Sequence, residues 1–279
     1  LHTTIFPMEA KFEDGDIYLG VEAFFELGDT KIRIGYKLYK EGDWVDVDVN
    51  VFPSESSKCI KVHIPLVGQE FTGDQVFGME TLFEDGNECI AHNFLALKQD
   101  EGNFIEVITP STYGCSYKDG IMRVTLLRTS TYCAHPVPNF PLVKSNIFIP
   151  KVDQGQRDFS FRLTVSKEEE LEYNADMFIE KPYALNIFPT IDKKQDNGFY
   201  IKSTNPLINT VTIKEGVQKP GYLFRLQNNS MSNQKSTLNV NGKTIKLSFA
   251  KFEVKTIQYI NNELKEVEEM VKIISSEEK

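Results

Sequence analysis

The segment Ser111 to Pro136, STYGCSYKDGIMRVTLLRTSTYCAHP, contains the strongest hairpin signal of the sequence. Asp119-Gly120 fits a two-residue primed turn, which needs a positive φ that glycine adopts without steric cost. We therefore expect one strand at 113–118 and a second at 121–128. In the second strand apolar and polar residues alternate as far as Leu126. Leu127 breaks this alternation, as happens where a strand becomes buried on both faces.

A polar loop follows this hairpin. It starts at Arg128 and is rich in Thr, Ser, Tyr, Cys, His and Pro. Because the preceding strand is almost wholly apolar, it anchors the backbone while the side chains of Arg128, Tyr132 and His135 leave the sheet. Pro136 and Pro138 restrict the loop and lower the entropy lost on docking. The three polar residues are therefore candidates for an interdomain or substrate-cleft surface; the alternative is a loop packed on its own sandwich.

The composition sets the class of protein. With 279 residues, 41% of them hydrophobic, the chain has room for one large β domain or for a larger and a smaller one. A net charge of −9 argues against nucleic acid and against anionic membranes, since both reward clustered Lys and Arg. The sequence contains neither a membrane-spanning apolar run nor a signal-peptide pattern, so a cytoplasmic location is expected. Four irregularly spaced cysteines are typical of reduced thiols.

The sequence predicts an all-β protein of two sandwiches. Period-two alternation is cleanest in Trp44–Phe52, where four valines on one face of the strand alternate with Asp and Asn residues on the other. Further strands of the larger sandwich are expected at 16–27, 31–39, 58–64, 76–83, 89–97, 104–108 and 157–165. Shorter strands of an immunoglobulin-like sandwich are expected at 184–188, 199–203, 210–214, 222–228, 236–240, 244–249 and 253–260.

Two helices are predicted. Ser166-Lys167-Glu168-Glu169 is a capping-box pattern, so a linking helix should cover 167–178. The tail at 262–279 carries Leu264, Val267, Val271 and Ile274 at roughly heptad spacing, which indicates an amphipathic helix. The expected organisation is a large β domain at 1–180, a small β-sandwich at 181–261 and the helical tail at 262–279.

No catalytic or metal-binding motif is recognisable. The four histidines stand outside every HxD, HExxH or related pattern. Cys59 and His63 share a strand face, but Lys61 lies between them and no third ligand is near in sequence, so a solvated or sheet-packed face is the better interpretation. Carboxylates occur in nearly every turn, so no glycosidase pair can be chosen. We therefore assign no catalytic and no metal residue to this chain.

Four phrases, in colinear order, resemble the C-terminal β region of family 38 glycoside hydrolases, the zinc-dependent retaining α-mannosidases. The first is the Tyr-Gly hairpin followed by "LLR" and a Ser/Thr-rich loop at 113–132. The second is WVDVDVNVFPSESSKCIKVHIPL at 44–66, in which Phe52-Pro53 replaces the family's Asp-Trp. The others are IPKVDQGQRDFSFRL at 149–163, with Arg157 where His is common, and the closing strands GYLFRLQNNS and KFEVKTIQY.

This resemblance implies a fold and a role. The family's C-terminal region is a galactose mutarotase-like β supersandwich followed by a smaller sandwich, both packed on an N-terminal α/β catalytic domain. That domain supplies the zinc ligands and the Asp nucleophile, and no position here matches their motifs. The implied partners are the N-terminal catalytic domain of the same polypeptide and an α-mannoside, with a homodimer left open. Zinc is implied for the missing catalytic domain and not for this fragment.

Two other classes of protein remain as alternatives. A free-standing carbohydrate-binding module needs an exposed aromatic platform, and Trp44 is the only tryptophan. A mutarotase-like enzyme needs a histidine pair beside a carboxylate, which His63 and His92 could supply only if the sheet brings them together.

Overall fold

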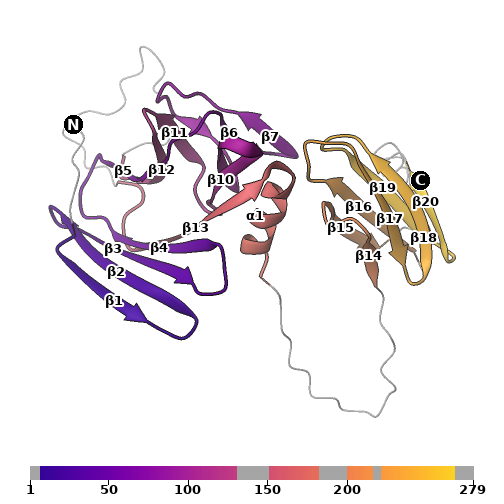
Figure 1. The fold of residues 1–279 in the computed structure, drawn as a ribbon, viewed down its shortest axis with the longest axis horizontal. Helices are drawn as coiled ribbons and strands as arrows, with labels where there is room; N and C mark the ends of the chain where they lie inside the picture. Colours follow the sequence, from indigo (N-terminus) through magenta and orange to yellow (C-terminus); the bar gives the residue numbers. More distant parts are fainter. Residues whose placement is uncertain (1–6, 131–150, 182–199, 216–220, 268–279) are drawn as a thin grey trace, which may run out of the picture. The chain divides into compact units, whose positions relative to one another are not determined.

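The computed structural model describes residues 7–130, 151–181, 200–215 and 221–267 (Figure 1). The chain forms two compact units. Unit 1 contains Leu1–Gln75 and Glu80–Ser166, and unit 2 contains Val76–Met79 and Lys167–Lys279. The proposed division at residue 180 is not decided by these units and stays a proposal. No helix within the described ranges is long and apolar enough to cross a membrane.

A nine-stranded sheet, here called sheet A, forms one layer of unit 1. Its order is β1-β2-β3-β4-β13-β10-β9-β6-β7. These strands are β1 (Glu9–Asp14), β2 (Tyr18–Leu27), β3 (Thr30–Tyr39), β4 (Trp44–Phe52), β6 (Phe71–Gln75), β7 (Gly78–Thr81), β9 (Phe94–Lys98), β10 (Asn103–Ile108) and β13 (Arg157–Lys167). The strands expected at 16–27, 31–39 and 44–52 are β2, β3 and β4, which pair in sequence order as an antiparallel meander. β1 extends this meander at its edge; sequence periodicity missed it because all six of its residues are exposed.

A four-stranded sheet, here called sheet B, forms the second layer. Its order is β5-β12-β11-β8, from β5 (Cys59–Pro65), β8 (Cys89–Ile90), β11 (Gly114–Lys118) and β12 (Ile121–Arg128). One continuous core lies between the two sheets and includes Val49, Phe71, Leu97 and Phe161 from sheet A and Met122 from sheet B. The predicted large antiparallel sandwich is therefore confirmed. Burying apolar surface of this kind is the main stabilising contribution to such a domain.

The hairpin that predicted the fold has the expected turn. Asp119 and Gly120 have φ of 52° and 71°, so both central residues are left-handed, as a primed turn requires. By contrast, the single strand expected at 89–97 is two strands in different sheets. β8 pairs with β11 in sheet B, and β9 pairs with β10 in sheet A. The bend between them at Ala91–Asn93 lets the chain cross from one layer to the other.

Unit 2 contains the smaller sandwich that the sequence predicted. One sheet has the order β14-β17-β18 and the other β15-β16-β19-β20. The strands are β14 (Ile201–Ser203), β15 (Ile208–Glu215), β16 (Gly221–Asn228), β17 (Gln234–Val240), β18 (Lys243–Phe249), β19 (Val254–Ile260) and β20 (Glu263–Val267). They enclose a separate apolar core that includes Phe224, Leu238 and Ile257. The strand expected at 184–188 lies outside the described residues.

The predicted linking helix exists, but its capping differs from the prediction. A 3-10 turn at Glu168–Glu170 leads into α1 (Leu171–Ile179). Ser166 is the penultimate residue of β13, and its hydroxyl donates a hydrogen bond to the buried carboxylate of Glu106. Glu170, not Glu169, accepts the backbone N–H of Lys167 at 3.1 Å. Ser166 therefore does not act as the N-cap, because its hydroxyl is already hydrogen-bonded to the buried carboxylate of Glu106.

The prediction of a helical tail is wrong for its first residues. Asn261 and Asn262 have φ of 51° and 65°, which makes a two-residue turn, and the chain returns as β20 antiparallel to β19. Asparagine tolerates the left-handed region because its short polar side chain bonds locally. Leu264 then packs against the core of unit 2. Residues 268–279 lie outside the described part of the chain.

Candidate functional site

The end of β12 positions Arg128. The register of β12 against β5 shifts between Thr125 and Leu127, which is a β-bulge at Leu126. The extra residue turns Leu127 into the core, where it is 4% exposed, and leaves Arg128 exposed. The sequence prediction attributed the broken alternation at Leu127 to burial on both faces. The bulge is its actual cause.

The backbone beyond Arg128 is fixed at both sides of the loop. Thr129 is fully buried; its N–H donates to Lys58 O at 2.9 Å, and its carbonyl accepts Ser57 N–H at 2.7 Å. The Lys58 N–H donates to Thr129 Oγ1 at 3.0 Å. On the return side, Val152 N–H donates to Ser130 O at 2.9 Å. The loop therefore leaves and re-enters unit 1 at one anchored point, although Tyr132 and His135 lie outside the described residues.

The guanidinium of Arg128 belongs to a polar cluster around Glu88. Its Nη2 lies 3.7 Å from Glu88 Oε1, while the Lys61 ammonium and the Thr125 hydroxyl each donate a short hydrogen bond to the same carboxylate. The Arg128 N–H also donates to Asp153 Oδ2 at 3.3 Å. We call Lys61, Glu88, Thr125 and Arg128 the Glu88 cluster. These residues come from β5, from β12 and from the position preceding β8.

The Glu88 carboxylate stays ionised in this cluster. Its partial burial by itself would raise the pKa, but the hydrogen bonds from Lys61 and Thr125 and the charges of Lys61 and Arg128 outweigh that effect, so the pKa lies below its usual value of 4.5. Two hydrogen-bond donors and the Arg128 ion pair on one carboxylate make a positioning network. A carboxylate that is held charged is a poor proton donor. The cluster can orient Arg128 but has no group suited to acid catalysis.

A glycine makes room for this carboxylate. A Cβ at Gly114 of β11 would lie 2.9 Å from Glu88 Oε1 and 3.1 Å from Thr125 Cβ. Next to it, Cys115 is buried, and its burial raises the pKa of the thiol to about 12. The thiol is therefore protonated and unreactive. Cys59, Cys89 and Cys115 are all free thiols, and Cys133 lies outside the described residues.

The structure does not bring His63 and His92 together. His63 lies on β5 and His92 follows β8, the two opposite edges of sheet B. Three strand spacings separate these edges, which is about 14 Å. His92 instead packs edge-on against Tyr113, with 6.1 Å between the ring centroids. The histidine pair that a mutarotase-like enzyme requires is thus not formed by these residues.

Trp44 is not a sugar-binding platform. The Arg162 guanidinium lies 4.8 Å above its ring, and Arg162 is itself held by two hydrogen bonds to Asp46 of 2.6 Å and 2.9 Å. Tyr39 packs beside it at a centroid distance of 5.7 Å, and a Cβ at Gly42 would lie within 2.9 Å of three ring atoms. A carbohydrate platform needs a free ring face, whereas Trp44 serves to pack this end of sheet A.

The described residues include no group of three or more His, Cys, Asp or Glu side chains that could hold a metal ion. Cys59 and His63, considered from the sequence, therefore gain no third ligand within that part of the chain. Sequence analysis identified Arg128 but missed Glu88 and Asp153, which lie 40 and 25 positions from it. A carboxylate just before a short strand gives no local signal of its partner two strands away.

The comparisons with known proteins agree with the fold. Residues 4–139 match the model of the glycosyl hydrolases family 38 C-terminal domain. A protein of glycosyl hydrolase family 38 from Enterococcus faecalis superposes with a TM-score of 0.70 at 14% identity over 90% of this chain and 36% of that chain. An α-mannosidase from Enterococcus faecalis V583 gives 0.69 at 14% identity over 90% of this chain and 35% of that chain. A search of curated protein sequences gives no match.

The structural similarities and the family match establish different things. At 14% identity the two solved structures establish the fold alone, and the match covers only about a third of their length. The family model adds a match at the sequence level, and it spans the Trp44–Phe52 strand and the 113–132 hairpin phrase that carry the resemblance. Residues 4–139, just under half of the chain, thus resemble the C-terminal domain of glycosyl hydrolases family 38.

Proposed function

We propose that this chain is the non-catalytic C-terminal β portion of a zinc-dependent retaining α-mannosidase, in which it packs on and supports the catalytic domain. The observation that carries this proposal is the family match over residues 4–139, joined to a common fold over 90% of the chain. One of the two similar structures is an α-mannosidase by name. The parent polypeptide, on this proposal, hydrolyses α-mannosides in the cytoplasm, as a monomer or a homodimer.

The proposal assigns zinc to the N-terminal catalytic domain. The described residues of this chain do not fit a zinc site, because structural and catalytic zinc both need at least three protein ligands converging on one point. When bound in a mannosidase of this family, zinc would supply Lewis-acid contacts to the sugar. This chain's own residues would then contribute position and support.

The loop beginning at Arg128 is the proposed contact with the catalytic domain. The anchored backbone at Thr129 and Ser130 fixes where the loop leaves the sheet, and the Glu88 cluster fixes Arg128 while leaving its side chain 58% exposed. Arg128, Tyr132 and His135 would buttress the substrate cleft without reacting in it. An arginine held by one carboxylate and still exposed keeps free donors for a partner.

The first test uses the isolated 279-residue chain. We expect it to fold, to hold no stoichiometric zinc and to leave aryl α-mannosides intact, because the described residues form no ligand set. Metal analysis after purification without chelators, together with a mannosidase assay in added zinc, measures both properties. One tightly bound zinc per chain, or turnover that survives removal of contaminating enzymes, would contradict the proposal.

A further inference from the structure

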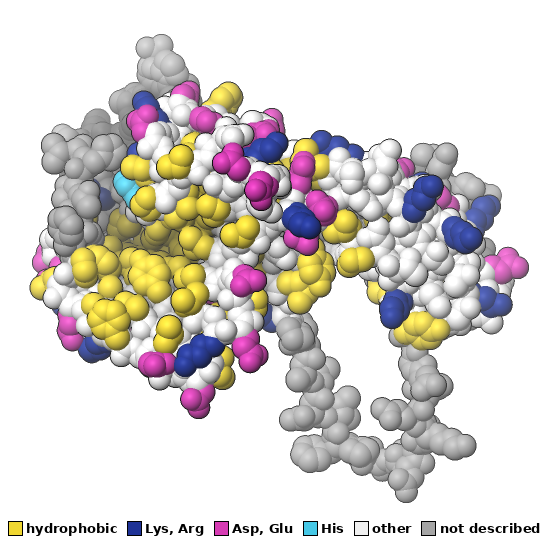
Figure 2. Space-filling view, in the orientation of Figure 1, with side chains coloured by type: hydrophobic (Ala, Val, Ile, Leu, Met, Phe, Trp, Pro, Cys, Tyr) yellow, Lys and Arg dark blue, Asp and Glu magenta, His cyan; other side chains and the backbone are white. Residues whose placement is uncertain are grey.

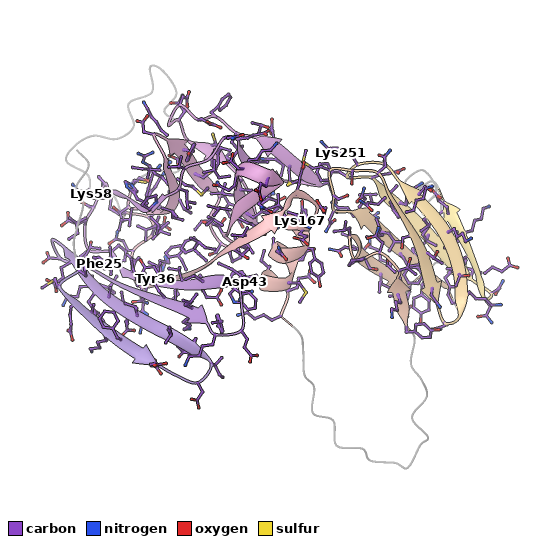
Figure 3. All side chains as sticks on the ribbon, in the orientation of Figure 1. Phe25, Tyr36, Asp43, Lys58, Lys167 and Lys251 are labelled. Carbon is purple, nitrogen blue, oxygen red and sulfur yellow. The ribbon has the colours of Figure 1, made fainter. Side chains whose placement is uncertain are left out.

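One part of unit 1 exposes a broad apolar face. Figure 2 shows hydrophobic side chains gathered over the region of β1 to β3, and Figure 3 labels Phe25 and Tyr36 there. Period-two alternation and the strand register put these residues on the face that continues into the core. The exposed members of this face, which we call the β1–β3 face, are Met8, Phe12, Leu19, Tyr36 and Leu38, at 68%, 81%, 42%, 40% and 47%.

The face is exposed because sheet A is wider than sheet B. One row of cross-strand partners runs from Phe12 through Tyr36 and Val47 to Phe161. Along this row the exposed fraction falls from 81% to 40%, then to 7% and 2%. Sheet B has four strands against nine in sheet A. The core between the sheets takes its buried sheet A residues from β4, β6, β9, β10 and β13 and, in β3, from Ile32, so β1 and the parts of β2 and β3 around Leu19, Tyr36 and Leu38 lie beyond it. The same apolar pattern therefore continues past the point where the domain can bury it.

The size of this face is that of an interface. If a fully exposed large side chain contributes ~200 Å², these five leave roughly 550 Å² of apolar surface. Contiguous apolar patches larger than a few hundred Å² are rare on soluble proteins and mark interaction sites. Interfaces are about three-fifths apolar, so a patch of this area corresponds to roughly 900 Å² on one partner, close to the standard size of a stable complex.

The charge around the face selects the kind of partner. Residues 1–166 carry 24 acidic and 15 basic side chains, so the whole net charge of −9 belongs to them, while 167–279 are neutral. The turns at one end of the face hold Asp14, Asp16, Glu41 and Asp43, and Figure 2 shows acidic side chains along this rim. Lys40 is the one cation in these turns and is ion-paired with Asp14 at 2.9 Å, so the rim stays net acidic. A second copy would set two acidic rims against each other. A surface with an apolar centre and a Lys/Arg rim would be complementary.

We propose that the β1–β3 face is the docking surface for an apolar, basic-rimmed surface on the remainder of a family 38 polypeptide. This inference rests on the proposed function and adds a second contact, separate from the Arg128 loop. The two similar solved chains have about two thirds of their length outside the match, which provides chain of the required size. Burial there would remove the largest apolar exposure that β1 to β3 leave.

The experiment compares oxidation of two methionines by hydrogen peroxide. Met8 lies on the face and is 68% exposed, whereas Met177 of α1 is 62% exposed and lies in unit 2. In the isolated chain, sulfoxide should form at similar rates at both positions, because access to peroxide controls the reaction. In the product of the complete reading frame that contains this chain, we expect Met8 to lose its oxidation relative to the isolated chain.

Every other outcome overturns the inference. Equal oxidation of Met8 in the isolated chain and in the complete product overturns the inference, as does a reading frame that adds no further domain. Protection of Met8 already in the isolated monomer means that the chain covers the face itself. Protection that grows with concentration of the isolated chain means that a second copy does. Both of these results also overturn it.

A variant separates this inference from the proposed function. Phe12→Asp changes a side chain that is 81% exposed, so the isolated chain should keep its thermal midpoint, while the complete product should regain Met8 oxidation. Ile213→Asp, on the exposed side of β15, is the control and should change neither. α-Mannosidase activity with an unprotected Met8 refutes the docking surface alone. Protection without activity refutes the proposed function alone.

Discussion

At the scale of single residues, the Glu88 cluster shows what the sequence can and cannot reveal. Arg128 was predictable because it ends a strand whose apolar alternation is visible in the letters themselves. Glu88 was not, because its partners Lys61, Thr125 and Arg128 reach it only through the strand order β5-β12-β11-β8. Strand order depends on long-range pairing, which local patterns do not encode.

Gly114→Ala should destabilise the protein by displacing the Glu88 carboxylate. The new Cβ would lie 2.9 Å from Glu88 Oε1, so the side chain must move and its hydrogen bonds to Lys61 and Thr125 weaken. We expect the free energy of unfolding to fall by about 1 kcal/mol, the scale of one lost hydrogen bond. Urea denaturation measures it, with Gly35→Ala in β3 as the matched control, because a Cβ there meets nothing within 4 Å. Equal losses in the two variants would contradict the steric account.

Glu88→Gln should reveal a pH-dependent contribution to stability. The folded-state pKa of Glu88 lies below 4.5, so its charged form stabilises the fold above that value and the benefit disappears as the pH falls through the folded pKa. The difference in unfolding free energy between wild type and Glu88→Gln should therefore be present at pH 7 and shrink below pH 4.5. Chemical denaturation over this range checks it, with Glu41→Gln as an exposed control. A difference that stays constant with pH would mean the charge is not responsible.

At the scale of elements, the long alternating strands were predictable and the sheet crossings were not. Trp44–Phe52 is β4 with the predicted bounds, because four valines in strict alternation leave one register for a half-buried strand. The single strand expected at 89–97 failed because the sequence does not say that Cys89 and Leu97 belong to different layers. The tail failed because Leu264 and Val267 fit a helical spacing as well as they fit β20.

Cleavage just after α1 tests the proposed domain break. Limited chymotrypsin digestion between residues 181 and 190 should release a C-terminal β fragment, because the small sandwich has its own core and interdomain interfaces within a chain are commonly modest. Chymotrypsin is preferable to trypsin, since Pro182 follows Lys181 and blocks tryptic cleavage there. Mass spectrometry of timed samples identifies the fragments. Cleavage confined to the chain ends would indicate a single fused body.

At the scale of the whole molecule, the family assignment came from the order of four phrases, none of which forms a catalytic site. The described residues form the large sandwich, the small sandwich and a polar cluster. The chemistry that we propose belongs to a part of the polypeptide outside them. On the proposed function, the zinc ligands belong to the N-terminal catalytic domain, so these 279 residues give no local signal of them. This explains why more of the fold than of the function could be predicted from the sequence.

On the proposed function, Arg128→Ala should affect the complete polypeptide more than the isolated chain. In this chain Arg128 makes one long ion pair at 58% exposure, and such surface pairs contribute about 0–1 kcal/mol. In the complete polypeptide, the variant should lower mannosidase activity or domain cohesion while the isolated chain keeps its thermal midpoint. Activity assays and thermal scans of both proteins provide the comparison, with Arg157→Ala as a control at an exposed position. Equal destabilisation of the two proteins would reduce Arg128 to a structural part of unit 1.

The place of β13 in sheet A delays completion of the sheet during synthesis. β13 lies between β4 and β10, so residues 157–167 join two half-sheets that are already complete in sequence by residue 108. On the ribosome, therefore, a nascent chain that ends before Arg157 holds two open edges, each a template for pairing with another strand. Only when β13 emerges do the registers Phe159 to Val49 and Phe161 to Val47 close this gap. The vectorial arrival of one late strand, and not the formation of the early hairpins, thus sets how long the nascent polypeptide exposes edges that can pair wrongly.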